Sequence, residues 1–89
     1  MNAEWKLFAD LAEVAGDRHV AVTVETGTVR AALDALLTDR PALEDRVFDD
    51  GGGLHDHINV LRNGAPVDDL DADVEDGDEL ALFPPVSGG

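Results

Sequence analysis

The sequence predicts an α+β domain in which a mixed sheet of about five strands packs on one main helix plus a short second helix. Three observations carry this prediction. One segment alternates apolar and polar residues, as a half-buried strand does; the next has apolar residues at helical spacing; and turn residues separate short apolar segments in the carboxyl-terminal half. A chain of 89 residues is enough for one small domain.

The amino-terminal part predicts two strands. Residues 4–8 form the first expected strand, and a loop over residues 9–17 follows, with Leu11 and Val14 on one side. Residues 19–25 alternate cleanly and place three valines on one face, which is the pattern of a half-buried strand.

The next segment predicts the main helix. Thr28 has the side chain of an N-cap residue, and residues 29–37 carry apolar side chains at helical spacing, which form one stripe. Pro41 ends this helix, because the residue before a proline disfavours helical angles. A short second helix is expected over residues 41–48.

The carboxyl-terminal half predicts the remaining strands. Residues 58–62 form a strand, and the Asn-Gly pair at 63–64 is favoured in tight hairpin turns. Val67 begins a short partner strand, and a turn over residues 76–78 leads into the last strand, residues 79–83. A helix between two strand pairs packs across one face of a mixed sheet. This order of elements is the β-grasp plan of ubiquitin-like proteins.

The composition excludes several classes of function. Twenty acidic residues against six basic ones give a net charge of −14, which repels nucleic acid and anionic lipid. Without cysteine, the chain has no disulfide, thiolate nucleophile or cysteine-ligated metal. No apolar run approaches the roughly 18–20 residues of a membrane span. The first residues lack the features of a signal peptide, so we expect a cytoplasmic protein, monomeric when free.

The excess of carboxylates predicts adaptation to a salt-rich cytoplasm. At molar salt the screening length falls to about 3 Å, so that self-repulsion fades. In dilute buffer the same charge should strain the compact state. We therefore expect the melting temperature to rise with the concentration of potassium chloride. A melting temperature that does not depend on salt would contradict this prediction.

Three segments together indicate a family. Residues 7–16 contain Phe-Ala-x-Leu-x-Glu-x-x-Gly, residues 60–64 read Val-Leu-Arg-Asn-Gly, and residues 76–89 read Asp-Gly-Asp-Glu-Leu-Ala-Leu-Phe-Pro-Pro-Val-Ser-Gly-Gly. They resemble the opening, the central strand and turn, and the ending of the molybdopterin synthase small-subunit (MoaD-like) family. The acidic composition points to its haloarchaeal branch, the small archaeal modifier proteins. The chain departs from the family pattern at Ala12, where many relatives have arginine.

The resemblance implies a function for the Gly-Gly ending. In this family an E1-like enzyme uses ATP to adenylate the carboxylate of the terminal glycine, here Gly89 preceded by Gly88. The acyl group then passes to a lysine of a target protein, giving an isopeptide bond. Alternatively it passes to sulfur, giving a thiocarboxylate for molybdopterin synthesis in the large synthase subunit. We expect a protein modifier. The alternative is a sulfur carrier, and one protein could also serve both functions. In each case we expect the chain not to be an enzyme and not to bind a cofactor.

The tail itself suits entry into another protein's active site. Glycine has no Cβ and passes through a narrow channel. We divide the chain into a domain over residues 1–83 and a flexible tail over residues 84–89, which spans roughly 20 Å when extended at about 3.3 Å per residue. Pro84 and Pro85 stiffen the exit, and with Val86 they are expected to contact the partner. The remaining alternatives are a frayed terminus and a non-covalent binding module with an inert tail.

Strand alternation predicts an apolar patch on the outer face of the sheet. Leu80 and Leu82 should face the helix, which places Phe83 outside. The same reasoning places Phe8 and Leu61 outside, and we expect the three to form one exposed patch. Such patches usually bind a partner, and the family's enzyme-facing surface is this face. The alternative is that a wide core or the tail buries the two phenylalanines.

The other sequence features give weaker evidence for a functional site. His55 and His57 have no defined third ligand, and zinc takes three or four, so no metal site is expected. The acidic, glycine-rich loop at residues 49–53 lacks the Lys-Ser or Lys-Thr of a phosphate loop. The carboxylates of residues 68–78 lack EF-hand spacing and are expected to be a solvated surface. Lys6, the only lysine, is the possible acceptor in self-conjugation besides the amino terminus.

Overall fold

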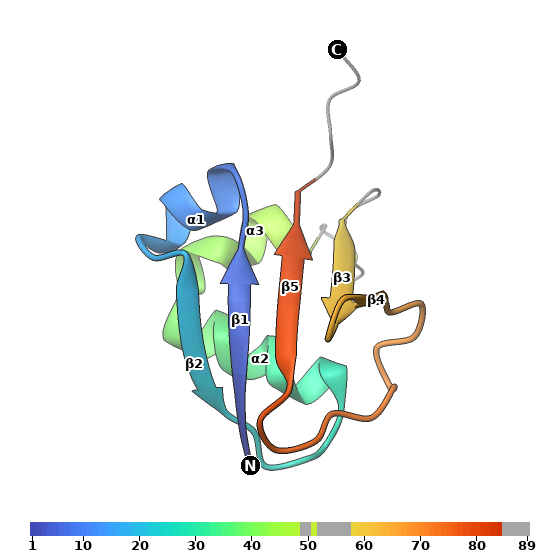
Figure 1. The fold of residues 1–89 in the computed structure, drawn as a ribbon. Helices are drawn as coiled ribbons and strands as arrows, with labels where there is room; N and C mark the ends of the chain where they lie inside the picture. The colour runs from blue at the N-terminus through green and yellow to red at the C-terminus, as the bar shows by residue number, and fades with distance from the viewer. Residues whose placement is uncertain (49–50, 52–57, 85–89) are drawn as a thin grey trace.

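Five strands form one mixed sheet in the computed structural model, which describes residues 1–48, 51 and 58–84 (Figure 1). The strands are β1 (Asn2–Leu7), β2 (His19–Thr23), β3 (Asn59–Arg62), β4 (Ala65–Pro66) and β5 (Glu79–Phe83). Their order across the sheet is β2-β1-β5-β3-β4. The central strands β1 and β5 are parallel, and the other neighbours pair antiparallel. The predicted mixed sheet of five strands is confirmed.

The main helix, α2 (Val29–Asp39), lies across one face of this sheet (Figure 1). Thr28 is its N-cap, because its hydroxyl accepts a hydrogen bond of 3.1 Å from the N–H of Ala31. A 3-10 turn, η1 (Pro41–Leu43), and a short helix, α3 (Glu44–Val47), follow. The main helix and the short second helix are therefore both confirmed.

The loop expected after the first strand is wrong, because its middle forms a helix, α1 (Asp10–Ala15). Gly16 ends the helix with φ of 84°, and its N–H donates to the carbonyl of Ala12 at 3.0 Å. Leu11 and Val14 stand three residues apart, as on a helical face. A helix of six residues, however, gives too short a window for periodicity to identify it.

The hairpin between β3 and β4 has the tight turn that its Asn-Gly pair predicts. Asn63 and Gly64 both have positive φ, 49° and 85°, as a type I′ turn requires. The partner strand β4 begins directly after this turn and not at Val67. Val67 still extends the pairing, since its N–H donates to the carbonyl of Val60 at 2.8 Å.

The core lies between the sheet and α2, and Trp5 is its largest member. The Trp5 side chain is fully buried, and its indole N–H donates to the carbonyl of Ala32 in α2 at 3.0 Å. Leu80 and Leu82 are also fully buried, so the inward face predicted for β5 is confirmed. In the part of the chain that the structure describes, no helix has the length and apolar character needed to cross a membrane.

Candidate functional site

The outer face of the sheet carries a pair of stacked aromatic rings. β1 and β5 are parallel neighbours with Leu7 opposite Leu82, so the next residues, Phe8 and Phe83, follow side by side. Their ring centroids are 4.1 Å apart and the ring planes differ by 11°. This is a stacked aromatic pair, and such pairs contribute about 0.5–1.5 kcal/mol beyond the area that they bury.

Leu61 lies on the same face. It stands opposite Ala81 in the β3–β5 pair, one diagonal step from Phe83, which is opposite Asn59. We call Phe8, Leu61 and Phe83 the aromatic patch. The prediction that this patch is exposed is wrong in degree, because each of the three side chains is half-buried. The two stacked rings cover part of each other's surface, which reduces their exposure.

An ion pair lies beside the aromatic patch on the outer face of the sheet. Lys6 stands opposite Ala81, and its Nζ lies 3.0 Å from a carboxylate oxygen of Glu79. Its side chain is 37% exposed, so solvent screens this ion pair and keeps it weak. His19 Nδ1 lies 3.1 Å from Glu4 Oε1 further along the sheet.

Asp78 holds the beginning of β5 in place. Its Oδ2 accepts hydrogen bonds from the N–H of Glu75 at 2.8 Å and from Arg62 Nε at 2.6 Å, and its Oδ1 accepts one from Asn63 Nδ2 at 3.0 Å. The residue is only 8% exposed, so the expectation of a solvated surface is wrong at this carboxylate. The hydrogen bonds from Glu75, Asn63 and Arg62 outweigh burial and lower the pKa of Asp78 from 3.8 to about 2.

Replacing Asp78 by asparagine tests this arrangement. A carboxyl group whose pKa is lowered by folding stabilises the protein above its unfolded pKa and ceases to do so as the pH falls through its folded pKa. We expect Asp78→Asn to lower the free energy of unfolding at neutral pH by about 1.5–3 kcal/mol, the contribution of a hydrogen bond to a charged group. The deficit should shrink between pH 3.8 and about 2.

Urea unfolding at several pH values measures this deficit. The exposed Asp68, in the same acidic segment, provides the control Asp68→Asn, which removes one charge without breaking a buried contact. A deficit that stays constant down to pH 2 would contradict the role assigned to the Asp78 carboxylate.

Several predicted site residues lie outside the described part. Pro84 is described and half-buried directly after β5, whereas Pro85, Val86, Gly88 and Gly89 are outside the described residues. Most of the glycine-rich loop at 49–53 and both histidines of 55–57 are outside as well. No group of three metal-ligating side chains occurs within residues 1–48, 51 and 58–84.

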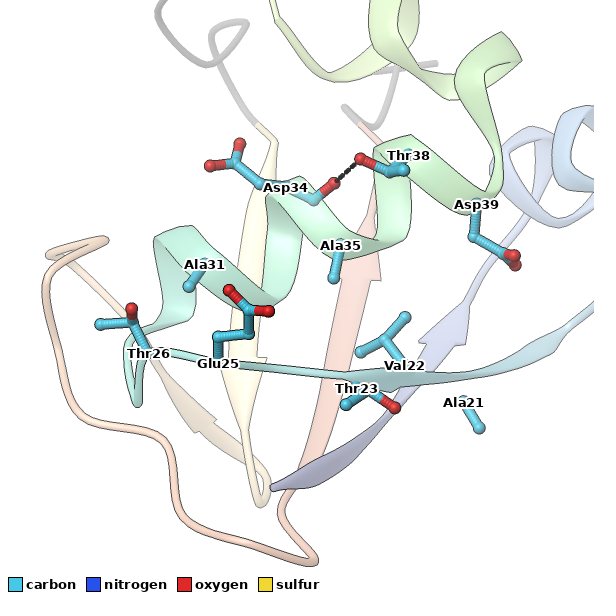
Figure 2. A pocket seen from close by; sticks show the side chains of 10 residues that line it. All are labelled: Ala21, Val22, Thr23, Glu25, Thr26, Ala31, Asp34, Ala35, Thr38 and Asp39. Carbon is cyan, nitrogen blue, oxygen red and sulfur yellow. Dashed lines mark hydrogen bonds between the residues drawn. The ribbon is translucent and has the colours of Figure 1, made fainter.

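One feature of the surface has no counterpart in the sequence patterns. A groove of about 760 Å³ lies between β2 and α2, on the side of the molecule away from β4 (Figures 1 and 2). Val22 projects from the strand, and Ala31 and Ala35 project from the helix toward it (Figure 2). The groove exists because both helix residues are alanines, whose side chains are too short to fill it.

Comparison with known proteins places the chain in a family. The ThiS family matches residues 5–89. Small archaeal modifier protein 1 of Haloferax volcanii is 66% identical over 87 residues, which are 97% of this chain and 99% of that protein. The crystal structure of SAMP1 from Haloferax volcanii superposes with a TM-score of 0.94, at 63% identity and with both chains fully covered. The predicted β-grasp fold and the predicted resemblance are thereby confirmed.

A further structure of the same fold contains two different proteins. A chain in the crystal structure of the Amycolatopsis orientalis BexX/CysO complex is 27% identical, with a TM-score of 0.80, and the match covers 98% of this chain and 99% of that one. A chain of this fold therefore occurs in a complex with another protein.

Proposed function

Because this chain belongs to the ThiS family, we propose that it is a ubiquitin-like protein modifier, joined through the carboxylate of Gly89 to lysines of other proteins in the cytoplasm. The observation that carries the proposal is its similarity to small archaeal modifier protein 1 over 97% of the chain, with 66% identity. The chain serves as a substrate and not as an enzyme.

The reaction needs an E1-like activating enzyme and ATP. A carboxylate oxygen of Gly89 attacks the α-phosphorus of ATP and releases pyrophosphate, giving an acyl-adenylate. The nitrogen of a lysine amine then attacks the acyl carbon, AMP leaves and the nitrogen loses a proton. The chain itself presents the Gly89 carboxylate to the enzyme, because β5 ends beside Phe8 and the sequence continues from there through Pro84 to Gly89.

The aromatic patch supports docking of the activating enzyme. It lies at the carboxyl ends of the two central strands, where the chain leaves the sheet toward its last residues. A half-buried aromatic pair has apolar area still to bury and loses little side-chain entropy, which are the properties of residues that dominate interfaces. We therefore assign Phe8, Leu61 and Phe83 to the enzyme-facing surface, together with Pro84, Pro85 and Val86.

Replacing Phe83 by alanine tests this assignment. We expect activation, measured as ATP-dependent release of pyrophosphate by the activating enzyme, to fall about tenfold, equivalent to about 1.4 kcal/mol. The matched control is Phe48→Ala, which removes a half-buried ring outside the patch. Equal rates for wild type and Phe83→Ala, with the fold intact, would contradict the assignment.

A sulfur carrier is the second candidate function. It uses the same tail and the same adenylation, but a sulfide-level sulfur nucleophile attacks the acyl carbon, AMP leaves and the tail ends in a thiocarboxylate. The match to the ThiS family and the resemblance to the molybdopterin synthase small subunit favour it. The partner would then be the large synthase subunit. Alkylation with a thiol-specific reagent detects the thiocarboxylate, since the chain has no cysteine to react instead.

A further inference from the structure

Within the part of the chain that the structure describes, strand β2 leaves one side of its backbone unpaired. It is an edge strand there, and its one partner strand is β1. Met1 and Val24 exchange two hydrogen bonds, of 2.8 and 3.2 Å, so they form a hydrogen-bonded pair of the antiparallel ladder. Because such pairs alternate, Val22 also directs its N–H and C=O toward β1. Ala21 and Thr23 therefore direct theirs toward the open edge.

The two edges of the sheet differ in how they are protected. The opposite edge strand, β4, has two residues, and one of them is Pro66. Short length and proline are common ways of preventing an edge from pairing with another chain. β2 has five residues, without proline, lysine or a bulge. This edge is thus left competent to accept a further strand.

The β2–α2 groove lies along this open edge. Its lining includes Ala21 and Thr23, the two residues with outward-facing backbone groups. Val22 and the two alanines of α2 form an apolar floor on the helix side (Figure 2). A strand added to β2 would place every second side chain over this floor, which has room for small aliphatic groups.

The charges of the groove identify the kind of segment that fits. Among the residues that the structure describes, its lining contains three carboxylates, Glu25, Asp34 and Asp39, and no lysine, arginine or histidine. Within the described residues, Asp39 shares the guanidinium of Arg40 with Asp17, and neither Glu25 nor Asp34 has an ion pair. The groove is therefore complementary to basic side chains. A second copy of the chain, with its net charge of −14, is disfavoured for the same reason.

We propose that the β2–α2 groove binds an extended segment of another protein, which adds as a strand to β2. The segment carries small aliphatic side chains at alternate positions and lysine or arginine at its ends. Its backbone hydrogen-bonds to the outward-facing groups of Ala21 and Thr23. Through this site another protein binds the modifier without a covalent bond, and deletion of Gly88 and Gly89 leaves this binding unchanged.

The proposal is tested with a fluorescent peptide in which valines alternate with serines and both ends carry lysines. We expect saturable binding to the full-length protein by fluorescence anisotropy, with backbone amide shifts centred on Ala21 and Thr23. The same peptide with glutamate ends should bind at least about tenfold more weakly. No saturable binding of the lysine-ended peptide, shifts at another surface, or equal affinity of the two peptides would overturn the proposal.

Ala21→Pro removes one outward-facing N–H without removing a bond to β1, so the strand should keep its pairing. We expect it to weaken binding about tenfold or more, whereas Ala21→Ser, which keeps the N–H, should bind like wild type. If Ala21→Pro does not fold, Ala35→Gln takes its place as the test. Its longer side chain obstructs the groove from the helix, and it should weaken binding to a similar extent. Unchanged affinity in the folded variants would overturn the proposal. A further outcome would also overturn it: if the wild type forms dimers without peptide and Ala21→Pro dissociates them, the edge binds a second copy of the chain.

Discussion

Deletion of Gly88 and Gly89 is expected to abolish both conjugation to lysines and thiocarboxylate formation. The acyl carbon that both reactions need belongs to Gly89, and the new terminus, Ser87, has a Cβ that a glycine channel excludes. Stability should not change, because the buried core residues of the described part run from Ala3 to Leu82. The loss is therefore chemical and not structural.

Immunoblots of tagged protein in its salt-grown host measure this loss, with the melting temperature of the purified protein as the check on folding. The point variant Ser87→Arg, which keeps both glycines, is the control and should still form conjugates. Conjugates formed by the truncated protein, or its complementation of a deletion strain, would contradict the assigned role of Gly89.

Trp5→Ala is expected to produce the largest loss of stability. The Trp5 side chain is fully buried at the centre of the sheet and is hydrogen-bonded to the carbonyl of Ala32, so it connects β1 to α2. Removing a buried tryptophan leaves a cavity and costs about 3–5 kcal/mol. Small domains typically have a free energy of unfolding of about 5–15 kcal/mol, so much of the stability should be lost.

Urea unfolding at a fixed, high salt concentration gives this value. Trp5→Phe is the matched control: it keeps an aromatic ring in the core, loses the hydrogen bond to Ala32 and leaves a smaller cavity, so its cost should be clearly lower. An alanine variant as stable as the phenylalanine variant would contradict the central position of Trp5.

The fold was predictable where one element repeats its pattern several times. β2 has two inward valines, with a third buried valine, Val24, directly after it, and α2 has a buried apolar stripe from Val29 to Leu36, so both elements appear as expected. α1 was not predicted because six residues are too few to show the helical spacing of apolar side chains. Asp78 escaped prediction because its partners Arg62 and Asn63 come from another hairpin, and only the folded sheet brings them together.

The same reason limits what could be predicted of the site. Alternation placed Phe8 and Phe83 on the outer face, but their stacking depends on the register between β1 and β5. The β2–α2 groove depends on where α2 crosses the sheet and on alanines that would pass unnoticed in any helix. Both are consequences of packing between distant segments, which no local pattern records.

The aromatic patch and the β2–α2 groove lie on different strands of the sheet. Phe83 is the last residue of β5, Leu61 lies in β3 and Phe8 directly follows β1, whereas the groove follows β2 at the edge. The two surfaces therefore share no residues. A conjugated copy, whose Gly89 is consumed, would still present its β2 edge to a reader protein.

The most direct test of the modifier function is mass spectrometry of proteins attached to the Ser87→Arg variant in a salt-grown host. The last tryptic site of the native chain is Arg62, which leaves a long branch on every target, whereas cleavage after the new arginine leaves only Gly-Gly. Protein modification predicts Gly-Gly on lysines of many different proteins. A variant with an alkylatable thiocarboxylate but no Gly-Gly on any lysine would contradict it and identify a sulfur carrier.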